Sequence, residues 1–491
     1  MIKILFTILS VSLFCYSNAQ TEIDALRYSQ NDIVGTARFS AMAGAYGALG
    51  ADFTTLSYNP AGLGFYQFSE LSFTPSFCDI ISTTYFGGDK NVDNKLNANF
   101  SNLGYVVSSP KNNEEWKRIN LAFGYNRFSN FNKRTFISGK NSMSSIADNF
   151  LTLSDGVTIE NLNPQHTELA FWTDIFDLAD NTFDTISDWY MFDNGQYISH
   201  IDGVSNKKQE KIITSSGSSG EYVFSAGTSF EDRIYLGATI GMPTVDYYEK
   251  STYTESELET INLADTSRNL ESFNYNKELS TTGKGLNLKL GVIARFNDWI
   301  RIGGALHSPT FYNMEEEYNS SMTAVWNNTS STEYSPFGYF DYELKTPWKA
   351  IGSVALNIKK QGLVSADIEI IDYASAQYNS DTYKFSKEND LINSTYTKAT
   401  NIRIGGEMKY KPFRIRAGYA LYGSPYKDNV ELEKESYSFG LGMDRGHLVA
   451  DFAYIFSEGS DEHFMYSSDL VGAATITTTQ HNFLVTIGLR Y

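Results

Sequence analysis

The chain has 491 residues and a formal net charge of −18, with 39 Lys and Arg against 57 Asp and Glu. This charge argues against nucleic acid as a partner, because proteins bind the phosphate backbone through clustered cations. The sequence has two cysteines, Cys15 and Cys78, and the first lies in a leader. The mature chain therefore cannot form an internal disulfide, and we expect Cys78 to be a buried, inert thiol.

Residues 1–19 have the features of a secretory signal peptide. Lys3 supplies the positive start, residues 4–16 form a short apolar run, and Ser17-Asn18-Ala19 offers a small-residue cleavage site. Cleavage leaves Gln20 as the first residue of the mature chain. The leader is excluded from reasoning about the fold.

The stretch from Gly35 to Gly64 differs from the rest of the chain. It is rich in Gly and Ala, nearly free of charge, and lacks sustained strand alternation. Because Gly and Ala allow backbones to approach closely, we predict a plug packed inside a barrel. The alternative is an ordinary N-terminal subdomain of a soluble β-protein.

From Glu70 onward the sequence reads as paired strands. In 481–491 the apolar residues Phe483, Val485, Ile487 and Leu489 fall on one face, and polar or small residues fall on the other. Such alternation does not separate a membrane barrel from a soluble sandwich. After the leader, no apolar run of about 20 residues predicts a transmembrane helix. A strand needs only about 10 residues to span a membrane, and the aromatic content of 15% suits aromatic girdles.

The lengths of the connections favour the membrane barrel. We predict 14 strands, near 69–86, 97–108, 119–131, 221–230, 233–248, 283–296, 299–314, 344–358, 362–375, 398–410, 413–424, 434–444, 447–458 and 480–491. After the third strand, short connections alternate with long ones, the longest at 132–220, 249–282 and 315–343. Short periplasmic turns and long extracellular loops are typical of outer-membrane barrels.

The prediction is therefore an all-β protein: a 14-stranded antiparallel transmembrane β-barrel with an N-terminal plug in the lumen. Residues 1–19 are the signal peptide, 20–68 the periplasmic segment and plug, and 69–491 the barrel, with a long extracellular insertion at about 132–220. The parity of the strands places both ends of the mature chain in the periplasm and the long loops outside the cell.

The insertion contains a candidate amphipathic helix over residues 168–191. Leu169, Trp172, Ile175 and Phe176 recur at helical spacing, and a series of Asp residues lies mostly elsewhere around the helix. The helix either offers an apolar landing groove or caps its own loop. The Asp series lacks the pattern of a calcium-binding loop, so we interpret it as a solvated face.

Enzyme motifs such as G-x-S-x-G and H-E-x-x-H do not occur, and the six histidines have no ligand-like spacing. We therefore expect neither catalysis nor a metal or cofactor. If the apolar face of each strand points outward, a set of cations points into the lumen: Arg301, Lys349, Arg403, Arg414, Arg416 and Arg490. They either bind an anionic head group or pair with inward acids such as Glu407 and Asp451.

Several stretches taken together resemble a known family. They are Gly44-Ala45-Tyr46-Gly47, Asn59-Pro60-Ala61-Gly62, Asp298-Trp299-Ile300-Arg301-Ile302-Gly303, Ser308-Pro309-Thr310, Thr346-Pro347-Trp348, Ala366-Asp367-Ile368-Glu369 with Asp372-Tyr373, and Arg416-Ala417-Gly418-Tyr419. In order and spacing the chain resembles the FadL/TodX family of outer-membrane transporters for long-chain fatty acids and other hydrophobic compounds. The stretch 24–29 is similar to the Bacteroidota branch of that family.

The resemblance implies a barrel closed by a hatch, here with Gly44, Gly47, Asn59, Pro60, Ala61 and Gly62. It implies an apolar extracellular groove, an interior pocket beside the hatch, and a kink in the third strand near Gly124 and Asn126. Candidate ligand contacts are Phe171, Trp172, Ile175 and Phe176 in the groove and Phe39, Met42, Tyr46 and Phe53 beside the hatch. Because Pro fixes its own φ and restricts the preceding residue, we expect Asn59-Pro60 to be a rigid turn rather than a ligand contact.

The expected function is passive transport of hydrophobic compounds. The implied partners are hydrophobic small molecules, outer-membrane lipid and the barrel assembly machinery during biogenesis. The alternative is a non-transporting barrel that serves as a subunit or scaffold of an outer-membrane secretion or surface-assembly complex.

Overall fold

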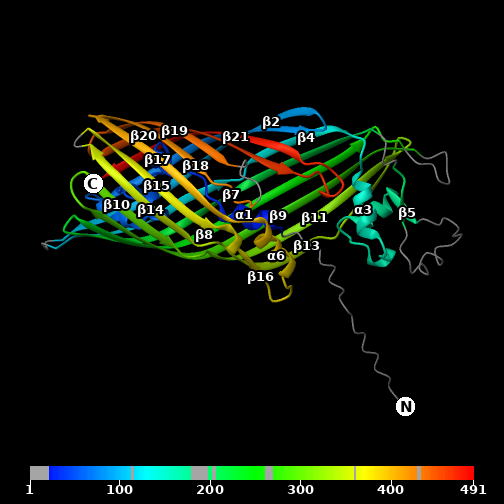
Figure 1. Ribbon diagram of the computed structural model, residues 1–491, viewed down its shortest axis with the longest axis horizontal. Helices are drawn as coiled ribbons and strands as arrows, with labels where there is room; N and C mark the ends of the chain where they lie inside the picture. Colours follow the sequence, from blue (N-terminus) through cyan, green and yellow to red (C-terminus); the bar gives the residue numbers. More distant parts are fainter. Residues whose placement is uncertain are drawn as a thin grey trace, which may run out of the picture.

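The computed structural model describes residues 21–111, 115–178, 197–201, 206–259, 269–358, 361–427 and 433–491. These residues form an elongated β-barrel (Figure 1). At one end, which we call the short-turn end, lie the C-terminus and tight connections such as Lys411-Pro412. The other, which we call the cap end, carries helix α3 and strand β5.

The wall is closed and antiparallel throughout. Its elements are β1 (Glu70–Phe86), β2 (Asp89–Pro110), β3 (Trp116–Asn130), β4 (Lys133–Asn141), β7 (Lys207–Phe230), β8 (Ile234–Ser256), β9 (Leu270–Arg295), β10 (Ile300–His307), β11 (Phe311–Trp326), β13 (Gly338–Lys345), β14 (Lys349–Ile358), β15 (Gly362–Asp372), β16 (Gln377–Asn379), β17 (Lys398–Tyr410), β18 (Phe413–Tyr422), β19 (Lys434–Asp444), β20 (Leu448–His463) and β21 (Ala474–Arg490). β1 pairs with both β2 and β21, which closes the ring. β3 with β4, β10 with β11, β13 with β14 and β15 with β16 are successive parts of single strands, so the described wall has 14 strands, as predicted.

The strands of the wall point their polar side chains into the lumen and their apolar side chains outward. On β1, Ser72 and Thr74 are buried, whereas Leu71, Phe73 and Phe77 are exposed on the outer face. A soluble sandwich would bury its apolar face instead. The exposed apolar outer face thus decides between the two interpretations that alternation alone left open. Among the described residues, no helix is long and apolar enough to cross a membrane.

Several strands run farther toward the cap end than predicted. β7, β8 and β9 include residues that we assigned to the loops 132–220 and 249–282, and β11 and β13 take up most of 315–343. Near the cap end the outer face of these strands carries mainly Ser, Thr, Asn, Lys and Glu, whereas the inner face carries apolar residues such as Tyr253, Phe273 and Met322. The ladder continues there without the apolar outer face by which the other strands were identified. β12 (Thr329–Tyr334) adds a hairpin to β11.

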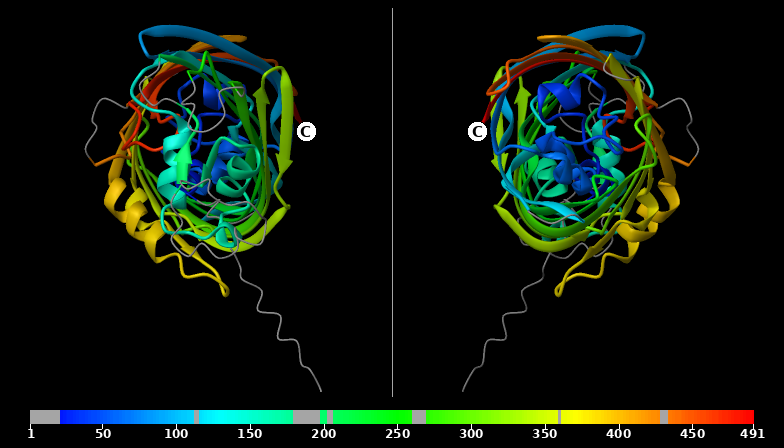
Figure 2. Two further views of the ribbon diagram at one scale, coloured as in Figure 1. Left: turned by 90° about the vertical axis from the view of Figure 1, so that its right-hand side faces the viewer. Right: turned by 90° about the vertical axis from the view of Figure 1, so that its left-hand side faces the viewer.

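The N-terminal segment, residues 21–68, lies inside the barrel (Figure 2), and we call it the plug. It contains α1 (Glu22–Ser29), α2 (Ala37–Ser40), η1 (Phe53–Ser57) and η2 (Pro60–Phe65). Thr21 does not lie at the short-turn end, because its carbonyl oxygen accepts a hydrogen bond of 2.8 Å from Tyr378 of β16. The C-terminal Tyr491 instead pairs with Ser69 at the short-turn end. Thr21 and the C-terminus therefore lie at different levels of the barrel.

The cap end is closed by a small folded unit, which we call the cap. It comprises α3 (Ile146–Ser154), η3 (Ile159–Asn161), α4 (Thr167–Trp172), the two-stranded sheet of β5 (Phe176–Leu178) and β6 (Tyr197–Ser199), and the loop 464–473. The helix predicted over 168–191 is wrong in length, since α4 ends at Trp172. Asp174 has a left-handed φ of 58°, which ends the helix, and 179–191 lie outside the described residues. A further helix, α6 (Ser386–Thr395), follows η4 (Tyr373–Ser375) and lies outside the wall (Figure 2).

Candidate functional site

The plug packs against wall glycines that face the lumen. A Cβ at Gly291 would overlap Asn59 Oδ1, and one at Gly237 would overlap the carbonyl of Pro60. The same holds around the ring at Gly104, Gly124, Gly227, Gly303, Gly405, Gly418 and Gly440. Only a residue without a Cβ allows such a close approach of backbone or side chain. The plug is therefore fitted to the wall on most of its sides.

Asn59 joins the two parts of the predicted hatch motif to the wall. Its side-chain nitrogen donates to the carbonyl oxygens of Gly47, at 2.6 Å, and of Val292, at 3.3 Å. Its Oδ1 accepts from the N–H of Ala61 at 3.1 Å and caps η2. The N–H of Gly47 donates to Asp367 Oδ2 at 2.8 Å. The geometry is that of a rigid turn fixed to β9.

The four plug side chains predicted beside a pocket are packed into the plug itself. Phe39 lies between the rings of Tyr46 and Tyr58, with centroids at 5.4 and 4.7 Å. Phe39, Met42, Tyr46 and Phe53 are at most 1% exposed. Phe53 fills the space beside Gly104 and Gly124. These residues seal the plug and are not available to a ligand in this conformation.

A cavity of about 240 Å³ lies between the plug and the wall, and its lining mixes polar residues with apolar ones such as Leu26 and Ile371. Its lining includes Gln30, Asn31, Asp32, Lys133, Tyr373, Asn401, Tyr422, Tyr426, Lys434, Ser457, Asp461, Thr478 and Gln480. Lys434 pairs with Asp32 at 2.6 Å, and Lys133 donates to Thr478 Oγ1 at 2.8 Å. The lining of the cavity is mixed and hydrogen-bonding, in contrast to the apolar pocket that the resemblance implies beside the hatch.

The lumen cations predicted from the sequence are held by protein partners. Arg416 pairs with Glu407 at 2.8 Å and with Asp451 at 2.6 Å. The other contacts are Arg403 with Glu369, Arg490 with Glu70, Arg414 with Asp444, Lys349 with the carbonyl of Ser29, and Arg301 over the ring of Phe65. This arrangement matches the alternative of an ion-pair network in the wall. Arg38 of the plug joins it, 3.5 Å from Glu407.

The ladder between β2 and β3 ends at Asn102 and Asn126. Asn126 accepts from Asn102 at 2.8 Å and donates to Ser57 of the plug at 2.9 Å. Beyond this point β4 pairs with β7 alone, while residues 89–101 of β2 pair with β1 alone. We call this break in the ladder the seam. It begins at the position where we predicted a strand kink.

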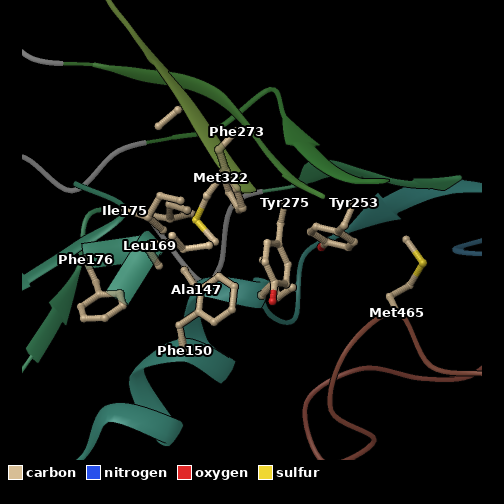
Figure 3. Close-up of a cluster of buried hydrophobic side chains, with 14 of the residues drawn as sticks. Ala147, Phe150, Leu169, Ile175, Phe176, Tyr253, Phe273, Tyr275, Met322 and Met465 are labelled. Atoms are coloured by element: carbon tan, nitrogen blue, oxygen red, sulfur yellow. The ribbon is translucent and has the colours of Figure 1, made fainter. Parts of the chain in front are cut away.

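Three of the four predicted groove residues lie inside the cap. Phe171, Ile175 and Phe176 are at most 4% exposed, whereas Trp172 is 47% exposed. Figure 3 shows Ile175 and Phe176 within the apolar cluster of the cap, together with Phe150 and Tyr275. Their packing fits the alternative of a helix that caps its own loop.

A buried carboxylate fastens the cap to the barrel. Glu255 of β8 accepts hydrogen bonds from Ser145 Oγ at 2.6 Å, the N–H of Ile146 at 2.9 Å and Gln209 Nε2 at 2.9 Å. The first two lie at the start of α3, where a negative charge is stabilised by free backbone N–H groups. The cap is thereby held at the mouth of the barrel.

Sequence reasoning missed three inward lysines below the cap. Lys211 of β7 contacts His463 Nε2 at 2.9 Å and the carbonyl oxygen of Met465 at 3.0 Å. Lys277 of β9 lies 5.0 Å from the ring centroid of Tyr275, and Lys133 of β4 lines the cavity between the plug and the wall. All three fall in stretches that we assigned to loops or to a loop boundary. A strand register would have been needed to identify them.

The fold and the site define a class: a β-barrel with an apolar outer face, a polar lumen and an N-terminal plug. No family model and no curated protein matches the chain. Solved structures do match. A Pseudomonas aeruginosa FadL homologue has a TM-score of 0.53 and 12% identity over 94% of this chain and 99% of its own. The Pseudomonas putida toluene transporter TodX has a TM-score of 0.52 and 11% identity over 94% and 99%.

The CymD monoaromatic hydrocarbon channel has a TM-score of 0.50 and 10% identity over 93% of this chain and 97% of its own. The chain thus has the fold of FadL-type outer-membrane proteins, which confirms the resemblance at the level of the fold. Two of these neighbours, TodX and CymD, are named as a transporter and a channel rather than as enzymes. Within the described part of the chain, no group of three or more His, Cys, Asp and Glu is placed to hold a metal ion.

Proposed function

We propose that the chain is a passive outer-membrane channel for hydrophobic compounds. The observation that carries the proposal is the plug, which is fitted to wall glycines and leaves no room for a side chain between them. A lumen filled by a closely fitted plug does not suit ions or sugars, which need a continuous aqueous path. It does suit an apolar solute that leaves sideways into lipid. The names of the structural neighbours, a toluene transporter and a monoaromatic hydrocarbon channel, support the same class of solute.

The seam supports a lateral route. There the wall is held by side-chain contacts, such as Thr84 Oγ1 donating to the carbonyl of Phe136 at 2.6 Å, instead of a continuous ladder. Plug residues Phe53 and Ser57 lie directly against the end of the seam at Asn126. A small shift of η1 would therefore reach the seam. In this proposal the short-turn end faces the periplasm and the cap faces the outside of the cell.

Uptake measurements test the proposal. A strain lacking the gene should accumulate less of at least one labelled compound from a panel of aromatic hydrocarbons, alkanes and fatty acids, and plasmid-borne protein should restore uptake. Unchanged uptake across the panel would contradict it.

A reversible lock tests the route. In a Cys78→Ser background, Ser57→Cys with Asn126→Cys should fix the plug to β3, because these side chains are in contact. Oxidation should then abolish uptake, and a reductant should restore it. The matched control is Thr323→Cys with Thr332→Cys, whose hydroxyls lie 2.9 Å apart on the adjacent strands β11 and β12. Uptake that survives the first lock would exclude this movement.

One observation favours the scaffold alternative. Residues 89–101 of β2 present a strand edge without a ladder partner on one side, and such an edge accepts an extended segment of another protein. A stoichiometric partner retained after mild solubilisation, and lost when this hairpin is shortened, would support a scaffold. A monomer that restores uptake would argue against it.

A further inference from the structure

We propose that the wall has a second lateral opening, between β16 and β17, through which an uncharged apolar solute enters the lumen from the outer leaflet of the membrane. The inference rests on the proposed function and adds an entrance to the exit at the seam. Helix α6 covers this opening from outside, and helix α1 of the plug lies behind it.

The ladder between β15 and β17 ends where β16 begins. Asp372 and Lys398 form its last pair, and the N–H of Tyr373 donates to the carbonyl oxygen of Thr397 at 3.2 Å. β16 pairs with β13 on one side, and no described strand pairs with its other edge. We call this place the α6 break. The seam lies between the second and third strands of the wall and the α6 break between the ninth and tenth, so the two lie half a turn of the 14-stranded wall apart (Figure 1).

Helix α6 takes the place of a strand at the free edge of β16. The side-chain amide of Asn389 accepts from the N–H of Tyr378 at 2.8 Å and donates to the carbonyl oxygen of the same residue at 3.0 Å. These are the two bonds that a residue of a paired strand would make. α6 has 10 residues, and no side chain of the described residues caps its start. Because a helix this short depends on packing, opening the wall here costs less than breaking a continuous ladder.

The inner side of the α6 break is apolar and aromatic. Leu26 of α1, Tyr378 of β16, Phe385 before α6 and Ile392 of α6 belong to one buried cluster. The hydroxyl of Tyr378 also donates to the carbonyl oxygen of Thr21, and α1 contacts α6. The cluster therefore runs from the plug, inside the barrel, to a helix outside the wall (Figure 2). Side chains alone separate the plug from the surroundings at this place.

The outer side of the α6 break is apolar as well. Ile370 and Trp348 are exposed on the outer face where the ladder is about to end, and Leu391 is exposed on α6. The break thus lies at the upper edge of the apolar outer face, which meets the outer leaflet in the orientation proposed above. Apolar solutes leave water for lipid. A solute dissolved in the lipid would reach the α6 break without passing the cap, which closes the aqueous mouth.

The cavity between the plug and the wall lies directly behind the α6 break. Leu26, Ile371, Tyr373 and Tyr426, which surround the break, all line it. Its volume is about 240 Å³, and an apolar cavity of about 150 Å³ is enough to hold benzene. A solute with the size of one aromatic ring therefore has room to move from the break into the lumen.

Labelling of a cysteine behind α6 tests the inference. Protein carrying Cys78→Ser and Leu26→Cys is placed in lipid nanodiscs, and the reagent is a long-chain alkyl maleimide dissolved in the lipid. Asn389→Ala should raise the rate of labelling about fivefold or more, the factor that the loss of a typical hydrogen bond gives. The matched control is Asn393→Ala, which removes an exposed amide from the same helix and should leave the rate unchanged.

A second reporter separates opening at α6 from general loosening of the plug. Ser57→Cys lies at the end of the seam, and Asn389→Ala should not change its labelling. No increase at Leu26→Cys, or an equal increase at Ser57→Cys, would overturn the inference. An increase at Leu26→Cys with a water-soluble maleimide but not with the alkyl maleimide would overturn it too, since the break would then open to water rather than to lipid.

These outcomes are distinct from those that test the proposed function. Uptake of hydrocarbons by cells, together with labelling that does not depend on Asn389, leaves the channel proposal standing and removes the second opening. Failure of every compound of the panel to enter cells removes the proposed function, and the entrance with it, whatever the labelling shows.

Discussion

At the scale of single residues, Asn59 is the point where the plug is held to the wall. Its amide contacts Gly47, Ala61 and Val292 and is fully buried. Asn59→Ala leaves these groups without partners, at a cost of about 1–3 kcal/mol. We expect the plug to loosen and ion conductance in planar bilayers to rise, as also for Pro60→Ala. Asn94→Ala, at an exposed position of β2, is the control. Conductance at the wild-type level in both plug variants would contradict the prediction.

Gly291 gives a second residue-scale prediction. Its missing Cβ is the space that Asn59 Oδ1 occupies, so Gly291→Ala forces the plug or the strand to move, at about 1–3 kcal/mol. Gly352→Ala is a matched control on β14, since a Cβ there meets nothing within 4 Å. In a detergent melt followed by heat-modifiable migration on a gel, Gly291→Ala should unfold at a lower temperature than Gly352→Ala. Equal melting would mean that the plug does not rely on this approach.

The contacts of some residues could be predicted from local chemistry in the sequence, and those of others could not. Asn59-Pro60 was predictable as a turn because Pro limits the backbone of both residues. The pairing of Arg416 with Glu407 and Asp451 was foreseeable because all three occupy inward positions on nearby strands. Lys211 and Lys277 were not, because the strand extensions that carry them lack the apolar outer face by which the other strands were identified. Phe39 and Phe53 were predicted to lie beside a pocket. Which apolar side chains of the plug are covered depends on the wall glycines that they meet, and the sequence does not reveal those contacts.

At the scale of elements, the start of α4 makes the stability of the closed cap depend on pH. Burial, and then the charge of Lys277, lower the pKa of His166 from 6.5 to about 4. Its Nδ1 accepts the N–H of Thr167 at 2.8 Å, at the start of α4. Below about pH 6.5 the opened segment binds a proton that the closed cap does not. The closed form is therefore fully favoured above that pH and loses stability as the pH falls toward 4.

Hydrogen exchange measures this loss. After correction for intrinsic rates, amides of α4 should exchange faster as the pH falls from 6.5 to about 4, by at most about tenfold per pH unit because one proton is taken up. His166→Asn keeps a side-chain acceptor without a titrating group and should remove the dependence. A pH dependence that persists in this variant would assign the effect to another group of the cap.

At the scale of the whole molecule, wall and plug depend on each other unequally. The ladder closes through β1 and β21 without any contribution from the plug, so the barrel should assemble when residues 35–64 are deleted. The plug, in contrast, has no ladder with the wall and is held by close packing at glycines and by contacts such as Arg38 with Glu407.

A wall of 14 strands encloses more space than its own side chains fill, and the wall glycines widen it further. The deleted protein should therefore form a steady, large ion conductance in planar bilayers, whereas the intact protein remains closed. Cells that produce it should become permeable to small polar solutes. A deletion variant that assembles, as judged by heat-modifiable migration, yet conducts no ions would show that the cap and the inward side chains close the lumen by themselves. The sealing role of the plug would then be wrong.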